Sequence, residues 1–122
     1  MPFNGMTVAL DTQTDRLLAN PVTEKLIYDQ MMEVVNAAKR MGIEHVDEEF
    51  VREMIDTTKA MTPYSPSMKL DYDFHRPMEI DYLYTRPIME AKKVGAEMPK
   101  LEMLEAELRF LQEKQAQRPM QE

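Results

Sequence analysis

The 122-residue chain contains no cysteine and no tryptophan. The lack of cysteine excludes a disulfide framework, a thiolate metal site and a cysteine nucleophile, and it suits a reducing compartment. No apolar run approaches the roughly 18 residues that a membrane-spanning helix needs. The N-terminus also lacks the basic-then-apolar pattern of a signal peptide. We therefore expect a cytoplasmic protein that has no membrane partner.

Basic residues are too few for a nucleic-acid-binding protein. The chain carries 22 acidic against 15 basic residues, which gives a net charge of -7. Nucleic-acid-binding domains gather Lys and Arg into a patch that neutralises phosphates, and the sequence shows no such patch. Nor does it contain a basic amphipathic face for an anionic membrane. A nucleic-acid partner is therefore not expected.

Glycine is scarce as well, with three residues in the chain. No glycine-rich phosphate loop is present, so the chain does not hold a dinucleotide through the usual strand–glycine–helix device. Gly42 and Gly95 instead stand where helical patterns stop. No segment shows strand alternation with hairpin turns. We expect one all-α domain over residues 1–115 and a frayed tail over 116–122.

Helical periodicity is clear after residue 20 and weaker before it, where we expect a turn and one or two helical turns. Asn20 and Asp47 are N-cap residues for helices that start at residues 21 and 48. Two further helices are expected over 77–94 and 99–115, and Pro87 should kink the first of them. The buried face of the helix that follows Asp47 is expected to contain Phe50, Val51, Met54, Ile55 and Thr58.

The segment SPSMKLDYDFHRPMEID, residues 65–81, is short, polar and broken by proline. In an extended segment alternate residues point the same way, so Asp71, Asp73 and His75 are candidate ligands for one divalent ion. The alternative, which we favour, is a solvated acidic loop that binds no metal. Ser67 and Glu79 also admit a purely local role in capping a helix and complementing its dipole.

The spacing within these segments resembles the C-terminal domain of ketopantoate reductase (2-dehydropantoate 2-reductase). The Ser-Met and Glu-Ile-Asp-Tyr motifs of that family are matched at the same spacing by Ser67–Met68 and Glu79–Tyr82. FNGMTVALDTQTDRLLANP is similar to the family's Asn-Pro/Gly-Leu-Thr/Ser-Ala segment and the short helix after it. KKVGAEMPKLEML is similar to its Gly-Val-x-Val/Thr-Pro segment. The likeness runs over roughly residues 3–112.

The resemblance implies a function as well as a fold. The fold would be the all-helical half of a two-domain enzyme, as in 6-phosphogluconate-dehydrogenase-like reductases, with the active site between the domains. The reaction would be NADPH-dependent reduction of a 2-keto acid, ketopantoate to pantoate in coenzyme A biosynthesis. Asn4 and Ser67 would bind the substrate, and Glu79 would be the catalytic and cofactor-contacting carboxylate. NADP would be held by a dinucleotide-binding partner domain that this chain does not contain.

The family's proton-donating lysine lies a few residues before the asparagine that matches Asn4. The chain begins at Met1 and does not contain it, and neither Lys25 nor Lys69 stands at that position. We therefore expect the isolated chain to be catalytically incomplete. Tyr84 and Thr85 replace a frequent Asn-Gly pair, so another 2-keto acid is an open alternative. A stand-alone helical interaction module without catalysis is the second candidate, and a homo-oligomer is expected.

Overall fold

The computed structural model describes residues 2–116, and all regular secondary structure in that range is helical. The all-α prediction is therefore confirmed. The predicted frayed tail, apart from Ala116, lies outside the described residues. Within residues 2–116, no helix combines the length and apolar character that crossing a bilayer requires. The elements are α1 (Pro2–Ala9), α2 (Thr14–Ala19), α3 (Pro21–Arg40), α4 (Glu48–Ala60), α5 (Ser67–Asp73), a π-helical turn η1 (Asp81–Thr85), α6 (Arg86–Lys93) and α7 (Pro99–Ala116).

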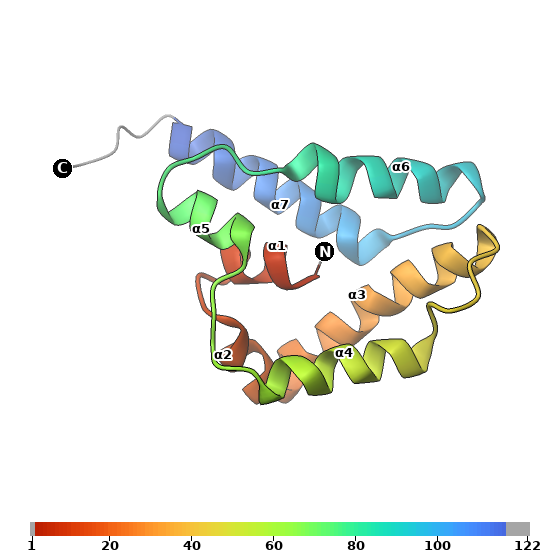
Figure 1. Ribbon diagram of the computed structural model, residues 1–122. Helices are drawn as coiled ribbons and strands as arrows, with labels where there is room; N and C mark the ends of the chain where they lie inside the picture. The colour runs from red at the N-terminus through yellow and green to blue at the C-terminus, as the bar shows by residue number, and fades with distance from the viewer. Residues whose placement is uncertain (1, 117–122) are drawn as a thin grey trace.

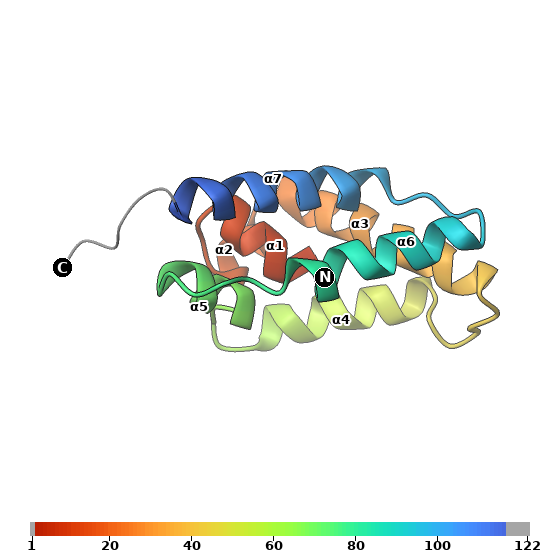
Figure 2. The ribbon, with the colours of Figure 1, turned by 90° about the horizontal axis from the view of Figure 1, so that it is seen from above.

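Helix α1 is the centre of the molecule. It contacts α2, α3, α5 and α7, and the pair α3 and α4 lies on the opposite side of it from the pair α6 and α7 (Figure 1). Seen from above, α1 lies between α7 and α4 (Figure 2). Its sequence, PFNGMTVA, is apolar on most sides, and a helix of that kind must be buried on most sides. The buried residues are Pro2, Phe3, Gly5, Met6, Thr7 and Val8.

The helix starts that the sequence predicts are confirmed at α3 and α4. The Asn20 side chain accepts a hydrogen bond from the Val22 N–H at 2.8 Å, and Asp47 accepts one from Phe50 N–H at 2.9 Å. Gly42 follows α3 with φ +84°, a left-handed conformation that favours glycine and ends the helix. These signals act within four residues of the cap, so a sequence can show them directly.

A contact with a segment distant in the sequence stabilises the first turn of α7. The buried Glu33 carboxylate on α3 accepts hydrogen bonds from the Lys100 N–H at 2.9 Å and the Leu101 N–H at 3.1 Å. The first amides of a helix lack intrahelical partners, and here a side chain from another helix supplies them. Leucines recur at helical spacing along α7, and Leu101, Leu104 and Leu108 are buried while Leu111 is partly buried.

The helix predicted over 77–94 differs in two ways from the structure. Residues 77–79 are not helical, and residues 81–85 form the π turn before α6. Pro87 has no N–H to donate to the carbonyl one turn earlier. In a regular helix, the proline ring would also clash with that carbonyl. A π turn inserts an extra residue at such a break, and the Arg86 N–H donates to the Asp81 carbonyl across it. The expected disturbance at Pro87 therefore takes the form of a π turn.

The predicted inner face of α4 is partly wrong. Val51, Ile55 and Thr58 are buried as expected, but Phe50 is 43% exposed and Met54 is 40% exposed. Phe50 and Met54 directly precede the buried Val51 and Ile55 in the sequence. They therefore form a second apolar stripe beside the buried one. Helix α4 therefore has a wider apolar side than the described part of the chain covers.

Tyr84 closes the core over α1. It is fully buried, and its hydroxyl oxygen accepts a hydrogen bond from the Gly5 N–H at 2.8 Å. That amide lies in the first turn of α1, where an intrahelical acceptor is missing. The approach is close because Gly5 has no side chain, and Tyr84 thus caps the central helix.

The buried phenol makes stability sensitive to alkaline pH. Burial raises the pKa of Tyr84, and the hydrogen bond from Gly5 offsets only part of that rise. An unfolded tyrosine releases its proton near pH 10, while folded Tyr84 keeps it, so stability is lost as pH rises above that value. The free energy of unfolding should fall by about 1.4 kcal/mol per pH unit through this residue.

Tyr84→Phe should remove that part of the slope. Urea unfolding at about pH 8 and at about pH 11 measures this slope. Between these pH values, the fall in the free energy of unfolding should be smaller in the variant than in wild type, by at least about 1.4 kcal/mol. Tyr82→Phe is the matched control, since Tyr82 is 65% exposed and should leave the slope unchanged. Equal slopes for wild type and Tyr84→Phe would contradict the expectation.

Candidate functional site

The polar segment 65–81 is not the extended loop that the sequence suggested. Residues 67–73 form helix α5, so Asp71 and Asp73 do not project in one direction as they would in a strand. His75 follows the helix with φ +58° and is exposed. Among residues 2–116, no group of three His, Asp or Glu side chains is placed to hold a metal ion. The geometric reason for the metal hypothesis is therefore wrong.

Asn4 and Ser67 come together although 63 positions separate them. Oδ1 of Asn4 accepts a hydrogen bond from the Met68 N–H at 3.2 Å and lies 3.5 Å from the Ser67 hydroxyl. The first contact caps α5 from α1, because Pro66 at the N-cap position provides no side-chain cap. The second is longer than an ordinary O–H···O bond, so the hydroxyl is only loosely held.

The capping contact also sets the direction of the Asn4 amide. Since Oδ1 faces the start of α5, Nδ2 points elsewhere, and among residues 2–116 neither of its two N–H groups has a hydrogen-bond acceptor. Asn4 is half-buried and Ser67 is exposed, so both groups are within reach of solvent. Together they offer an amide donor and a hydroxyl beside each other, which suits a carboxylate or a hydroxyl group of a small molecule.

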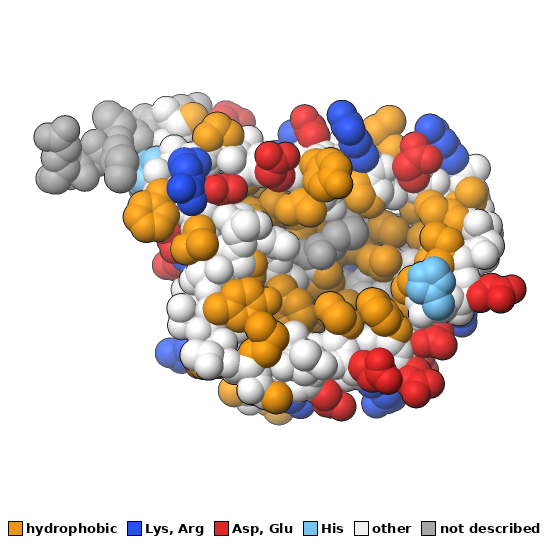
Figure 3. All heavy atoms as spheres, in the orientation of Figure 1, with side chains coloured by type: hydrophobic (Ala, Val, Ile, Leu, Met, Phe, Trp, Pro, Cys, Tyr) orange, Lys and Arg blue, Asp and Glu red, His pale blue; other side chains and the backbone are white. Residues whose placement is uncertain are grey.

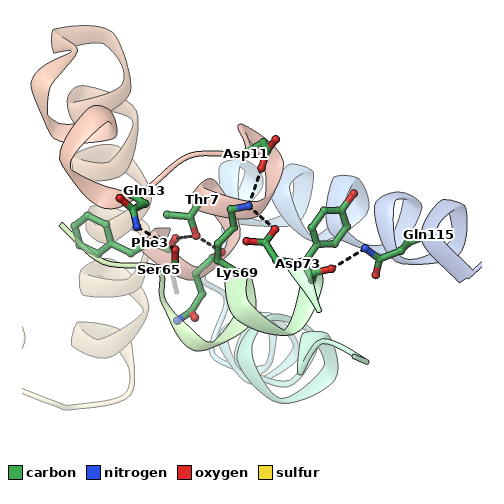
Figure 4. Close-up of polar contacts among 10 residues, drawn as sticks. Phe3, Thr7, Asp11, Gln13, Ser65, Lys69, Asp73 and Gln115 are labelled. Atoms are coloured by element: carbon green, nitrogen blue, oxygen red, sulfur yellow. Dashed lines mark hydrogen bonds and ion pairs between the residues drawn. The ribbon is translucent and has the colours of Figure 1, made fainter. Parts of the chain in front are cut away.

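Lys69 anchors α5 beside this pair. Its side chain is 7% exposed, and Nζ lies 2.7 Å from Asp11 Oδ1 and 2.6 Å from Asp73 Oδ1. Figure 4 shows the lysine reaching from α5 towards both carboxylates, with Asp11 in the turn after α1. Burial of the ammonium lowers the pKa of Lys69, but the hydrogen bonds and charges of Asp11 and Asp73 outweigh it, so the pKa lies above its ordinary value.

This role of Lys69 was not predicted from the sequence. The spacing of Lys69 and Asp73, one helical turn apart, was a signal for it, although the segment did not look helical. The bond to Asp11 had no local signal at all. Lys69 is thus a positioning residue that holds α5, and with it Ser67, against α1.

Glu79 lies apart from this contact network. It is exposed, and among the described residues no hydrogen bond or ion pair joins its carboxylate to Asn4 or Ser67. Its backbone is nevertheless held in place. The Met78 N–H donates to Gln112 Oε1 at 2.8 Å, and Ile80 is buried. The structure therefore brings two of the three predicted site residues together. The third lies on an anchored segment, where its side chain has no hydrogen bond or ion pair to another residue of the range 2–116.

Asp81 contacts α7. Its carboxylate lies 2.6 Å from the Arg109 guanidinium, which lowers the pKa of Asp81, and Arg109 also donates to the Thr85 hydroxyl at 2.5 Å. Thr85 in turn donates to Glu105. These contacts tie the π turn to α7, and none of them leads towards Asn4.

Comparison with known proteins gives a consistent family. The model of the family described as "Ketopantoate reductase PanE/ApbA C terminal" matches residues 1–112. A curated 2-dehydropantoate 2-reductase of Nostoc sp. strain PCC 7120 is 39% identical over 111 residues. That match covers 91% of this chain but 34% of the relative, so the chain spans about a third of its length.

Solved structures agree with this result. The crystal structure of 2-dehydropantoate 2-reductase from Geobacter metallireducens GS-15 superposes with a TM-score of 0.86 at 34% identity. The superposition covers 89% of this chain and 36% of that one. The ternary structure of D-mandelate dehydrogenase with NADH and anilino(oxo)acetate has a TM-score of 0.81 at 23% identity, over 94% of this chain and 64% of that one. At that identity the second match shows the fold alone.

Proposed function

Because the chain belongs to the ketopantoate reductase family and corresponds to its C-terminal region, we propose that it is the substrate-binding half of an NADPH-dependent 2-keto acid reductase. The proposed reaction is ketopantoate to pantoate, in coenzyme A biosynthesis. The observation that supports it most is the contact of Asn4 with Ser67 and the start of α5. That contact places an amide and a hydroxyl side by side at solvent-accessible positions.

Asn4 and Ser67 would bind and orient the substrate. The Nδ2 donors of Asn4 suit the carboxylate of a 2-keto acid, and the Ser67 hydroxyl can donate to the carboxylate or accept from a substrate hydroxyl. Both groups are neutral, so neither buries a charge when the site closes. The exposed Glu79 carboxylate would accept hydrogen bonds from hydroxyls of the substrate or of the cofactor ribose.

NADPH would be held by a dinucleotide-binding domain outside this chain, and when bound it supplies the hydride for the carbonyl carbon. Reduction also needs a proton donor at the carbonyl oxygen. Lys69 does not fit that role, because its ammonium is buried between Asp11 and Asp73. We propose that the donor is a lysine on the partner side, and that the chain alone is catalytically incomplete.

A fusion enzyme tests the proposal. The part of the Nostoc relative that precedes the matched region is joined to Met1, and oxidation of NADPH is followed with ketopantoate as substrate. Ketopantoate-dependent oxidation is expected, faster with NADPH than with NADH. Parallel assays with other 2-keto acids, including an aryl-substituted one, test the alternative substrate.

Binding of NADPH to the fusion, measured separately by fluorescence, shows whether the added domain is folded. A fusion that binds NADPH and reduces no 2-keto acid would refute the proposal. Reduction of another 2-keto acid in place of ketopantoate would refute the named substrate and keep the reaction class.

We propose that the enzyme is a homo-oligomer. Four large apolar side chains on η1, α6 and α7 are each more than half exposed, and large exposed apolar groups often mark contacts between proteins. They are Tyr82, Met89, Met103 and Phe110. Sedimentation of the fusion should give at least a dimer, and a monomer at assay concentration would contradict this part.

A further inference from the structure

The last two turns of α7 carry glutamines on the side that earlier turns fill with leucines. That side begins as a stripe of buried residues at helical spacing, Leu101, Leu104 and Leu108. Gln112 and Gln115 follow on the same side and are partly buried. An amide side chain that faces inwards needs a polar partner, because burial without one is costly. The partners of these two glutamines therefore indicate what they do.

Each glutamine contacts a segment of the candidate site, and each uses a different group of its amide. Oε1 of Gln112 accepts a hydrogen bond from the Met78 N–H at 2.8 Å, directly before Glu79. Nε2 of Gln115 donates to the Tyr72 carbonyl at 2.7 Å, in the last turn of α5. Figure 4 shows Gln115 reaching from α7 to α5. One helix thus contacts both segments that carry predicted site residues.

The contact at Tyr72 completes the capping of α5. This helix has seven residues, and a helix of that length is not stable on its own in water. Asn4 caps its first turn from α1, and Gln115 binds one of its last carbonyls, which lack partners within the helix. Side chains of two other helices therefore stabilise the two ends of α5, and the position of Ser67 depends on both.

The loop that joins α5 to Met78 does little to fix their spacing. Residues 74–77 are all exposed, and charged side chains stand at the surface along this stretch (Figures 1 and 3). A hollow of about 560 Å³ lies between the loop and α7, so the two are not closely packed. Arg76 pairs with Asp71 at 3.0 Å, which joins the loop back to α5. The spacing of the two segments therefore depends on other elements.

The backbone of Glu79 is fixed on both sides although its side chain is exposed. Met78 is 7% exposed and Ile80 is 2% exposed. The Leu83 N–H donates to the Glu79 carbonyl at 3.0 Å, which joins the segment to η1. A fixed backbone beneath an exposed carboxylate is the arrangement that a preorganised binding group needs.

We propose that Gln112 and Gln115 are positioning residues, which fix the spacing between Glu79 and Ser67 across the candidate site. Each acts through the backbone group that it binds, and neither contacts the substrate. The effect on the reaction rests on the proposed function, because it requires that Ser67 and Glu79 bind the substrate or the cofactor. The effect on the spacing depends on the hydrogen bonds of α7 alone.

The two amides use opposite groups, and this allows a crossed test in the fusion enzyme. Gln112→Glu keeps an acceptor for the Met78 N–H, whereas Gln112→Lys loses it. At position 115 the order reverses, because Gln115→Lys keeps a donor for the Tyr72 carbonyl and Gln115→Glu loses it. Each new charge is thus expected to be tolerated at one position and harmful at the other, so the four variants control for charge.

The value of kcat/KM for the 2-keto acid should fall about tenfold in Gln112→Lys and in Gln115→Glu, since a misplacement of about 1 Å can cost about 100-fold. It should stay within about twofold of wild type in Gln112→Glu and Gln115→Lys, where the hydrogen bond is kept. In a Glu79→Ala background Gln112→Lys should have no further effect, because it acts through Glu79.

The spacing itself is measured without turnover, in the full chain. Because the chain contains no cysteine, Ser67→Cys combined with Glu79→Cys takes nitroxide labels at these two positions alone. Pulsed EPR then gives the distribution of distances between the labels. Gln112→Lys and Gln115→Glu should broaden or shift that distribution, and Gln112→Glu and Gln115→Lys should leave it as it is in the parent.

The same distance distribution in all four variants would overturn the inference. An effect that follows the sign of the new charge at both positions would overturn it as well, and so would a changed spacing that leaves kcat/KM at the wild-type value. A fusion that binds NADPH but reduces no 2-keto acid would refute the proposed function, while the EPR distances would still decide whether the glutamines fix the spacing. The two failures are therefore distinguishable.

Discussion

Asn4→Ala in the fusion enzyme is expected to lower kcat/KM for the 2-keto acid about 100-fold or more. The change removes a donor to a charged carboxylate, which is worth roughly 1.5–3 kcal/mol. It also removes the acceptor of the Met68 N–H and so the cap of α5, worth about 1 kcal/mol, which loosens Ser67. Because a tenfold change in rate corresponds to about 1.4 kcal/mol, the two losses together correspond to two to three orders of magnitude in kcat/KM.

Two further variants separate the binding role of Asn4 from its structural role. Asn4→Asp keeps an oxygen that accepts from Met68, so the free energy of unfolding should stay near that of wild type. It loses the amide donors and adds a negative charge, so kcat/KM should remain as low as in Asn4→Ala. Asp73→Ala is the control, because Lys69 keeps its bond to Asp11. Wild-type kcat/KM in Asn4→Asp would show that Asn4 serves only as a cap.

Gly5→Ala is expected to destabilise the fold by about 3 kcal/mol, at the upper end of what overpacking causes. A Cβ atom at Gly5 would overlap the Tyr84 hydroxyl and lie 2.7 Å from Leu104 Cδ2. Both neighbours are buried, at 0% and 3% exposure, so neither can move into solvent. The overlap would also break the bond from the Gly5 N–H to Tyr84.

Chemical denaturation at neutral pH measures the effect. Gly5→Ala combined with Tyr84→Phe should be less destabilised than the sum of the single variants, because removal of the hydroxyl relieves the first overlap. Gly42→Ala is the matched glycine control. Nothing lies within 4 Å of a Cβ there, so only the left-handed φ of +84° opposes the change, at about 1 kcal/mol. If Gly5→Ala were no worse than Gly42→Ala, the packing at Gly5 would be looser than the structure indicates.

The sequence predicted those elements whose determinants are local. Asn20 and Asp47 act on amides two and three residues away, and the leucines of α7 repeat within one helix. Helix α5 was not predicted, because the residues that stabilise it are distant in the sequence. Asn4 supplies its cap, and Asp11 pairs with Lys69 across 58 positions. A polar segment broken by proline reads as a loop until those partners are known.

The residues of the candidate site were likewise not predictable from local sequence patterns. Asn4 and Ser67 were found through a family resemblance, and their contact supports that choice but was not predicted from spacing. Glu79 was found in the same way, and the structure leaves its side chain without a described partner. A site between two domains has this property in general, since groups on one wall are oriented in part by the other wall.

The burial of Lys69 gives the protein a chemical reporter of its own folding. An amine that is protonated and enclosed by two carboxylates reacts slowly with acylating reagents and cannot enter the active site of trypsin. Lys69 should therefore be modified or cleaved only after α5 separates from α1, while the lysines on the outer surface react at once. Mass spectrometry of a brief labelling pulse would then read how often the Asn4–Ser67 pair comes apart in solution.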